Sequence, residues 1–588
     1  MRRKLKVYAS LAVLRVAASV LLLGMIHPDE YFQSQEIMAR HFLPTDSVLR
    51  RELFVPWEFQ LATPNRSVLF PALVVGLPFK VFELVGIKLT GWLMLVTPRL
   101  LLCAASFLID AVLFHVVGKL SRYDKVAILQ EKQEMVLMLF ASSWPTLLFL
   151  CRPFSNTFEL LVFALCFAVL YLIKPTRRVL FGVLHAQTIL LGSLLALGVF
   201  TRFTFPVFFF PLGVELVRQQ DAFFIHASRK KELATSPSVV RRIVATIIVV
   251  MQGVGAFISW GIIFVLMDTL YYRPELFHGT FDQMFLKNIR QNAVIAPFNN
   301  LLYNTQYDNL KLHGVHPRFT HFAVNMPMLF GPLFVAFVLQ RFPNRSVFGT
   351  LSVLFPLACL SLAPHQEPRF LLPIMIPLYI FTVLNGNIGM MRFVTSTKSG
   401  QFLWIVFNLT LTLFFGVLHQ GGIVPMLLSL SSIASTPTKG VIMHLLTSSC
   451  HFNGMDDRSR QLIGSVPLVF ARTYMPPRFL LTGMTVTSSF QVIDVAGNDL
   501  NNISDWISVH DLLETKTFTV LLVLPASVTV SDVIPFTLKT VKLGSCTPHL
   551  STEDFSFELL SLELYLVNLM EEQALSIVDE EISNKFLV

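Results

Sequence analysis

The chain alternates between long apolar runs and short polar or basic segments over its first 418 residues. Several of these runs reach the roughly 20 residues that a helix needs to cross a hydrocarbon layer about 30 Å thick. Beyond residue 418 the apolar runs shorten to strand length, as in FTVLLVL at 518–524, and turn-forming residues separate them. The pattern predicts a polytopic α-helical membrane domain over 1–418 and a small luminal α+β domain over 419–588, which includes an acidic helix near 566–582.

The distribution of Lys and Arg predicts the topology, because basic residues collect in cytosolic loops. The N-terminal MRRKLK is placed in the cytosol, and the apolar run after it is interpreted as an uncleaved anchor. The stretch 67–88 contains Pro71, Pro78 and several charges, so it is predicted to form an interfacial or re-entrant helix pair that does not cross. Eleven spans are then predicted, at 7–26, 97–117, 135–150, 160–173, 179–200, 205–217, 243–267, 321–339, 347–363, 370–388 and 402–418.

This topology places four unusual polar motifs on the luminal side, although it was derived only from Lys and Arg. The motifs are HPDEYFQSQE (27–36), RPFSNTFE (152–159), HGVHPR (313–318) and PHQEPR (364–369). A single active site requires such residues on one side of the membrane. We therefore expect the motifs to act together.

Composition narrows the class of protein further. Hydrophobic residues make up 54% of the chain and charged residues only 14%, which excludes an ordinary soluble domain. The formal charge of +9 is explained by basic loops rather than by nucleic-acid binding. Of the six cysteines, only Cys450 and Cys546 lie in the polar C-terminal region, where an oxidising lumen would allow them to pair.

Asp29 and Glu30 are the leading catalytic candidates. A carboxylate at the end of a span is held rigidly and can act as a general base towards a sugar hydroxyl. His27 and Gln33 could orient the pair or contact the acceptor. The alternative is a polar cap that merely ends the first helix at the membrane interface.

The other motifs provide candidates for substrate binding. Arg369 is predicted to bind a phosphate, because guanidinium geometry suits phosphate oxygens, and HGVHPR offers a second such group in His313, His316 and Arg318. Arg152 and Glu159 could contact substrate or form an intramembrane ion pair that neutralises both. Acceptor-binding or structural roles are assigned to His27, Gln33, Arg152, Asn156, Glu159, His313, His316 and Glu367.

The sequence lacks the usual handles for a metal or a nucleotide. It contains no HExxH, no Asp-x-Asp pair, no Walker A lysine and no GxGxxG. An enzyme that uses a nucleotide sugar would need such a motif to bind the diphosphate of its donor. A polyprenyl-phosphate donor needs only one phosphate site and an apolar groove, so we expect neither a metal nor another cofactor.

At these motifs the chain resembles the dolichyl-phosphate-mannose-dependent mannosyltransferases of glycosyltransferase family 22, which have the GT-C fold. Within the family it is most similar to the branch that adds the fourth mannose to the glycosylphosphatidylinositol (GPI) precursor, with Pro153 and Phe158 as mild departures where Thr and Leu are expected. The resembling elements are HPDEYFQSQE, RPFSNTFE, DTLYYRPE (268–275), NNLLYN (299–304), HGVHPR, HQEPRFLLP (365–373) and TYMPPRFLL (473–481).

The resemblance implies an inverting transfer in the endoplasmic reticulum membrane, from a lipid-linked donor to the GPI precursor, that forms an α-1,2 linkage. Asp29 would be the base, Glu30 would orient the acceptor or assist the base, and Arg369, with His365 or Arg318, would stabilise the leaving dolichyl phosphate. Alternatives are a sister enzyme that adds the third GPI mannose, or an N-glycan lipid-linked mannosyltransferase. A transporter or scramblase is a distant alternative, since it predicts inverted repeats and polar residues on both membrane sides, and neither pattern is visible.

Overall fold

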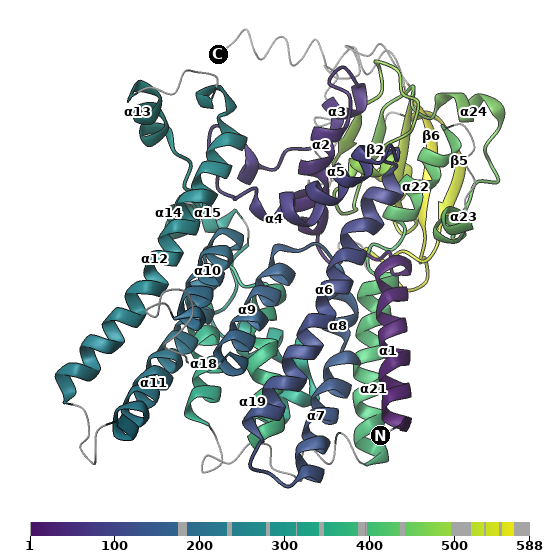
Figure 1. Cartoon of the computed structure of the whole chain (residues 1–588). Helices are drawn as coiled ribbons and strands as arrows, with labels where there is room; N and C mark the ends of the chain where they lie inside the picture. Colours follow the sequence, from purple (N-terminus) through teal and green to yellow (C-terminus); the bar gives the residue numbers. More distant parts are fainter. Residues whose placement is uncertain are drawn as a thin grey trace. The chain divides into compact units, whose positions relative to one another are not determined.

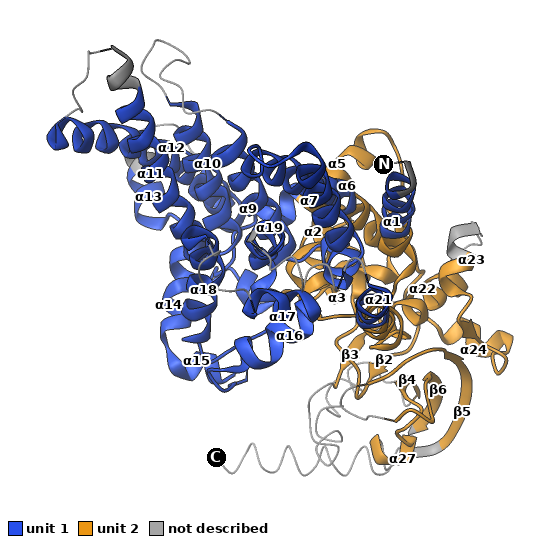
Figure 2. Cartoon of the chain, turned by 90° about the horizontal axis from the view of Figure 1, so that it is seen from below, with its two compact units in different colours: residues 1–16, 56–73, 101–409 blue, residues 17–55, 74–100, 410–588 orange. Residues whose placement is uncertain are grey.

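The computed structural model describes residues 2–173, 185–231, 238–277, 283–312, 314–339, 346–385, 394, 397–435, 441–495, 519–533, 537–551 and 556–569. Its contacts divide the chain into two compact units, shown in different colours in Figure 2. Unit 1 comprises residues 1–16, 56–73 and 101–409, and unit 2 comprises residues 17–55, 74–100 and 410–588. Both units combine segments that are far apart in the sequence, and the domain border at residue 418 stays a prediction.

The described part of unit 1 is helical (Figure 1). Its longer helices are α7 (Val126–Ala141), α9 (Ser155–Leu172), α10 (Ala186–Thr201), α11 (Phe205–Lys231), α12 (Val239–Tyr272), α13 (Gln283–Asn292), α14 (Ala296–Thr305), α18 (Val347–Ser361) and α19 (Met375–Asn385). Its short helical turns are η2 (Trp57–Phe59), α8 (Trp144–Leu148), η4 (Phe149–Cys151), η5 (Pro274–Phe277), α15 (Tyr307–Lys311), η6 (His321–Asn325), α16 (Met326–Phe330), α17 (Pro332–Val338) and η8 (Pro368–Ile374). Helices α1 (Arg2–Leu21), α6 (Gly91–Leu120) and α21 (Lys398–Leu413) contribute residues to both units.

Helices α10 and α12 run side by side in unit 1 (Figure 1). A Cβ atom on Gly192 would lie only 2.1 Å from the carbonyl oxygen of Gly253, so the two backbones are in direct contact. Small residues at such crossings are typical of helix packing in membranes, where van der Waals contact takes the place of the hydrophobic effect.

Four helical segments of the described chain are long and apolar enough to cross a membrane: Gly91–Leu120, Ser155–Leu172, Val239–Tyr272 and Lys398–Leu418, the last of which combines α21 with η9 (Phe414–Leu418). A pair bent by 61°, Val126–Ala141 with Trp144–Cys151, would add a fifth span. These segments coincide with five of the predicted spans and confirm a polytopic helical membrane protein. The number of eleven spans and the orientation stay predictions.

Proline and glycine interrupt some of the other apolar runs. The predicted span 321–339 consists of η6, α16 and α17, with Gly331 at a positive φ of 44° between the last two. The predicted span 370–388 begins within the 3-10 turn η8 instead of an α-helix. Hydropathy detects such runs but not their breaks, because a break depends on single residues.

The predicted helix pair over 67–88 is one helical stretch in the structure. Its elements α4 (Leu69–Pro71), η3 (Ala72–Gly76) and α5 (Leu77–Leu84) follow one another without a non-helical residue. The stretch is roughly 24 Å long at 1.5 Å per residue, which is less than the hydrocarbon thickness. Its length therefore agrees with a segment that does not cross.

The C-terminal part of unit 2 contains a mixed six-stranded sheet, counted over the residues that the structure describes, with the order β1-β5-β6-β4-β2-β3. Strand β2 pairs in parallel with β3 and β4, and the other pairings are antiparallel. The strands are β1 (Cys450–His451), β2 (Leu468–Phe470), β3 (Val492–Asp494), β4 (Thr519–Pro525), β5 (Thr537–Cys546) and β6 (Leu562–Leu569). The helices of this part are α22 (Ile423–Ile433), α23 (Val441–Thr447), α24 (Asp457–Leu462), η10 (Arg478–Leu481) and α27 (Val530–Val533).

The structure confirms one expected element of this region and corrects another. The apolar run 518–524 forms β4, whose residues Val520 and Leu522 belong to the core of the sheet. The acidic helix predicted near 566–582 is wrong for residues 566–569, which belong to β6. Pairing with β4 and β5 prevails there over the helical pattern of the sequence. Residues 570–582 lie outside the described part of the chain.

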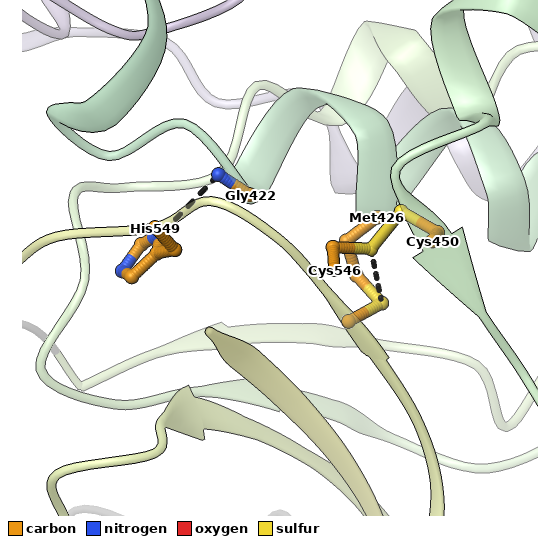
Figure 3. Close-up of a disulfide and its surroundings, with 5 residues drawn as sticks. All are labelled: Gly422, Met426, Cys450, Cys546 and His549. Carbon is orange, nitrogen blue, oxygen red and sulfur yellow. Dashed lines mark hydrogen bonds between the residues drawn. A yellow bond between two sulfur atoms is a disulfide. The ribbon is translucent and has the colours of Figure 1, made fainter. Parts of the chain in front are cut away.

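Cys450 and Cys546 form a disulfide, which confirms the expected pairing (Figure 3). The bond joins β1 to β5, whose register places the two residues opposite each other with their Cα atoms 4.0 Å apart. The Cys546 sulfur also contacts the sulfur of Met426 on α22. The disulfide thus cross-links two strands beside the helix that covers them.

Candidate functional site

Asp29 lies in the first turn of a helix in unit 2. The helical stretch begins at Asp29 and continues through the π-helical turn η1 (Tyr31–Gln35) into α2 (Glu36–Phe42). The side-chain amide of Gln33 donates to the Asp29 carboxylate at 2.7 Å, and the ring of His27 lies 3.6 Å from it. About a quarter of the Asp29 side chain is exposed, so a substrate hydroxyl can reach a carboxylate whose orientation is already restricted.

Glu30 has a different environment, although it is the next residue. Its carboxylate is fully buried and forms an ion pair with Arg99 of α6, with two guanidinium nitrogens at 2.5 and 2.8 Å. Arg99 also donates to the hydroxyl of Tyr31 and to the carbonyl of Leu22. Glu30 therefore anchors the start of this helix to α6, and Asp29 is the more accessible of the two acids.

Glu36 connects the HPDEYFQSQE segment to TYMPPRFLL (473–481), which lies in the C-terminal part of unit 2. Its buried carboxylate accepts the backbone N–H groups of Phe54 and Phe479, both at 3.1 Å. Burial raises the pKa of Glu36 to about 7, although these two bonds and the charge of Arg478 favour the ionised form. Arg478 donates to the carbonyl of Glu52, so the same motif bonds once to α2, through Glu36, and once to the segment after α2.

In unit 1, Glu367 binds the two residues of HQEPR that are candidates for phosphate binding, His365 and Arg369. Its carboxylate pairs with Nε2 of His365 at 2.7 Å and with Nε and Nη2 of Arg369. Burial lowers the pKa of His365, but the hydrogen bond and the charge of Glu367 outweigh this effect and raise it. Arg369 is almost buried, and its guanidinium lies near the rings of Phe154 and Phe370. Glu367 thus fixes an imidazole and a guanidinium side by side.

The structure brings HGVHPR next to HQEPR, as expected. The backbone of His316 bonds to the carbonyl of Pro364 at 2.8 Å, and its ring lies 5.8 Å from that of His365. The guanidinium of Arg318 is exposed and donates to the carbonyl of Leu362. His313 lies outside the described residues.

The RPFSNTFE motif forms the start of α9. Asn156 and Glu159 are fully buried, and Arg152 is nearly so. The cation that faces Glu159 is Arg202, 3.4 Å away, whereas the sequence offered Arg152 as its partner. Arg202 also donates to Ser155 and Asn156 at 3.1 and 3.3 Å.

Arg99 and Arg202 are absent from the candidates drawn from the sequence. Each is a single arginine in an otherwise apolar stretch, and such a charge requires a partner when it is buried. The isolated arginines could therefore have been noticed in the sequence, but the sequence does not identify the carboxylate that pairs with each. Within the described residues, no three His, Cys, Asp or Glu side chains lie together as metal ligands.

The two environments differ in what their side chains can do chemically. Unit 2 presents an accessible, oriented carboxylate, Asp29, that can accept a proton. Unit 1 presents Arg369 and His365, which can stabilise negative charge on a leaving phosphate. Proton removal from a hydroxyl and stabilisation of a phosphate leaving group are the two requirements of glycosyl transfer from a lipid phosphate.

Comparison with known proteins gives a consistent result over most of the chain. The sequence profile of the Alg9-like mannosyltransferase family matches residues 6–456. A relative from Homo sapiens, GPI alpha-1,2-mannosyltransferase 4, is 30% identical over 557 residues, which cover 87% of this chain and 80% of the relative. GPI mannosyltransferase 4 from Emericella nidulans is 32% identical over 475 residues, which cover 78% and 72%. Among solved structures, ArnT from Cupriavidus metallidurans bound to undecaprenyl phosphate aligns with a TM-score of 0.44 at 9% identity, covering 96% of this chain and 97% of that one.

Proposed function

The chain belongs to the Alg9-like mannosyltransferase family, and from this premise we propose that it adds the fourth mannose to the GPI precursor. The donor is dolichyl-phosphate mannose, the acceptor is the third mannose of the precursor, and the new linkage is α-1,2. The observation that carries this proposal is the similarity to GPI mannosyltransferases 4 from human and fungus over about four fifths of the chain.

The proposed reaction is a single displacement at the anomeric carbon. The bond from that carbon to the phosphate oxygen breaks while the bond to the acceptor oxygen forms on the opposite face. A β-linked donor therefore gives an α-linked product. Asp29 takes the proton of the acceptor hydroxyl, and Gln33 and His27 orient its carboxylate. Dolichyl phosphate leaves with the electron pair of the broken bond.

Arg369 and His365 are the proposed groups for the donor phosphate. Glu367 orients both, and the raised pKa of His365 keeps more of its ring protonated near neutral pH. A guanidinium and an imidazolium supply positive charge to a monophosphate leaving group without a metal. Arg318 contributes charge from the adjacent HGVHPR segment. We extend the proposal to a metal-independent reaction, which is tested by the assay below.

The decisive test is transfer by the purified full chain from dolichyl-phosphate mannose to lipid-linked acceptors that bear two or three mannoses. We expect product from the three-mannose acceptor, with an α-1,2 linkage by mannosidase digestion, and the same rate in the presence of EDTA. Transfer to the two-mannose acceptor alone would assign the third-mannose activity instead. Loss of activity with EDTA and its recovery with a divalent cation would refute the metal-free reaction.

We propose that the protein resides in the endoplasmic reticulum membrane with its N-terminus cytosolic and its polar motifs luminal. The disulfide of unit 2 supports an oxidising compartment for the C-terminal region. Helix α12 is roughly 51 Å long at 1.5 Å per residue, which is enough to carry the chain from one membrane face to the other.

This orientation predicts the result of protease protection in sealed microsomes. A cleavage site inserted between α11 and α12, near Lys230, should be cut from outside, and a site inserted near Gly314 should be protected until detergent is added. Immunoblotting of a C-terminal tag reports both fragments. Cleavage near Gly314 combined with protection near Lys230 would invert the orientation and remove the HQEPR motif from the lumen.

A further inference from the structure

Two motifs that the reaction does not use, DTLYYRPE and NNLLYN, both bind the segment 57–68 of unit 1. From the first motif, the buried Asp268 accepts the hydroxyl of Ser67 and the N–H of Val68, both at 2.9 Å, and the Tyr272 hydroxyl donates to the carbonyl of Arg66 at 2.6 Å. Together these bonds fix the backbone from the Arg66 carbonyl to Val68.

The second motif adds further contacts to the same segment. The side-chain amides of Asn299 and Asn300 donate to the carbonyls of Pro64 and Asn65 at 2.8 and 2.9 Å. The ring of Tyr303 stacks on Trp57 with centroids 4.3 Å apart. A segment with this many specific bonds is held in one conformation, so the backbone position from which the Arg66 side chain extends is fixed.

Arg66 is the cation on this segment, and it faces Arg202. The two residues line one small cavity of about 20 Å³ together with Asn65, Thr201 and Asn300. That volume accommodates one oxygen-sized group. Arg66 bonds to Glu58 at 2.9 Å and keeps 16% of its side chain exposed.

The counter-ion of Arg202 is loosely engaged. The Nε of Arg202 lies 3.4 Å from the carboxylate of its counter-ion, Glu159, which is beyond the usual N–H···O range. This nitrogen has no hydrogen-bond partner among the described residues. Burial and then the nearby charge of Arg66 lower the pKa of Arg202 to about 10, so it remains a cation at neutral pH. The guanidinium lies 5.0 Å from the ring of Phe370, and Arg369 lies 5.6 Å from the same ring.

Two cations that line one cavity, one of them with a loose counter-ion, favour an anionic oxygen, and a cavity of this volume admits one such oxygen of a larger phosphate group. We infer that Arg66 and Arg202 form a phosphate-binding position for a lipid-linked substrate, held in place by the DTLYYRPE and NNLLYN motifs. This inference rests on the proposed function and extends it beyond Arg369. The phosphate comes either from the polyprenyl donor or from a phosphodiester of the glycolipid acceptor, and kinetics distinguish the two.

The test is the separate measurement of KM for donor and for acceptor in Arg66→Gln and Arg202→Gln, on whichever acceptor the wild-type enzyme uses. We expect the KM for one substrate to rise about tenfold or more, as for the loss of a charge-assisted hydrogen bond, and the KM for the other to stay within about twofold. A rise for the donor assigns the position to the donor phosphate, and a rise for the acceptor assigns it to the acceptor phosphodiester. Arg66→Lys, which keeps the charge, should recover part of the affinity.

The matched control is Arg218→Gln, which breaks another arginine–glutamate pair of unit 1 and should leave both KM values unchanged. Unchanged KM values in a folded Arg66→Gln enzyme, or a fall in kcat alone, would overturn the inference. If Arg202→Gln does not fold, Arg66→Gln and Arg66→Lys decide the matter, because the Arg66 side chain is partly exposed. Since the assay uses the acceptor that the wild type accepts, a change in the assigned mannose would not affect the result.

Discussion

Asp29→Asn is expected to lower transfer by about 10²–10⁴-fold, the usual contribution of a general base, while protein level and membrane insertion stay at the wild-type value. Asparagine has nearly the same shape and keeps an oxygen that can accept the hydrogen bond from Gln33. It removes only the negative charge and the capacity to take a proton. The measurement is the initial rate with the preferred acceptor, normalised to the amount of folded enzyme.

Asp46→Asn provides the matched control for this substitution. Asp46 lies in the same segment of unit 2, carries an exposed side chain, and should tolerate the change without effect. Turnover of Asp29→Asn near that of Asp46→Asn would rule out Asp29 as the base. A loss of both activity and protein would instead identify a structural role for Asp29.

The fold class could be predicted from the sequence because it depends on simple averages along the chain. A helix that crosses a membrane needs a long apolar run, and α6, α9 and α12 are found where such runs were identified. Strand β4 and the disulfide could also be predicted from the sequence. A short apolar run and two cysteines in an oxidising environment each leave few structural alternatives.

The partners of the buried charges could not be predicted, because they depend on tertiary packing. Glu30 pairs with Arg99, 69 residues later, and Glu159 faces Arg202, 43 residues later. The sequence shows that an arginine in an apolar stretch needs a partner, but several carboxylates satisfy that requirement equally well. For the same reason the local motif RPFSNTFE suggested Arg152 for Glu159, whereas the structure places Arg202 there.

The adjacent acids Asp29 and Glu30 illustrate this difference. In the sequence they are equivalent candidates for catalysis, because both follow the first apolar run. In the structure one side chain is accessible, while the other is buried against α6. Successive positions of a helix point in directions about 100° apart, so neighbours in the sequence need not share a site.

Glu30→Gln is therefore expected to destabilise the protein rather than to act on the reaction itself. The substitution removes the carboxylate that neutralises the buried guanidinium of Arg99, and breaking one side of a buried ion pair costs roughly 3–5 kcal/mol. We expect less folded protein and a lower unfolding temperature in detergent. Arg99→Met should have a similar effect, because it leaves the Glu30 carboxylate buried without this cation.

The double variant Glu30→Gln/Arg99→Met separates this structural role from a catalytic one. With both charges removed, no charge of the pair remains buried, so the double variant should be more stable than the less stable single variant and should recover measurable transfer per folded molecule. A Glu30→Gln enzyme with wild-type stability and no turnover would contradict this expectation. It would show that the Glu30 carboxylate takes part in the reaction, with Arg99 as its orienting cation.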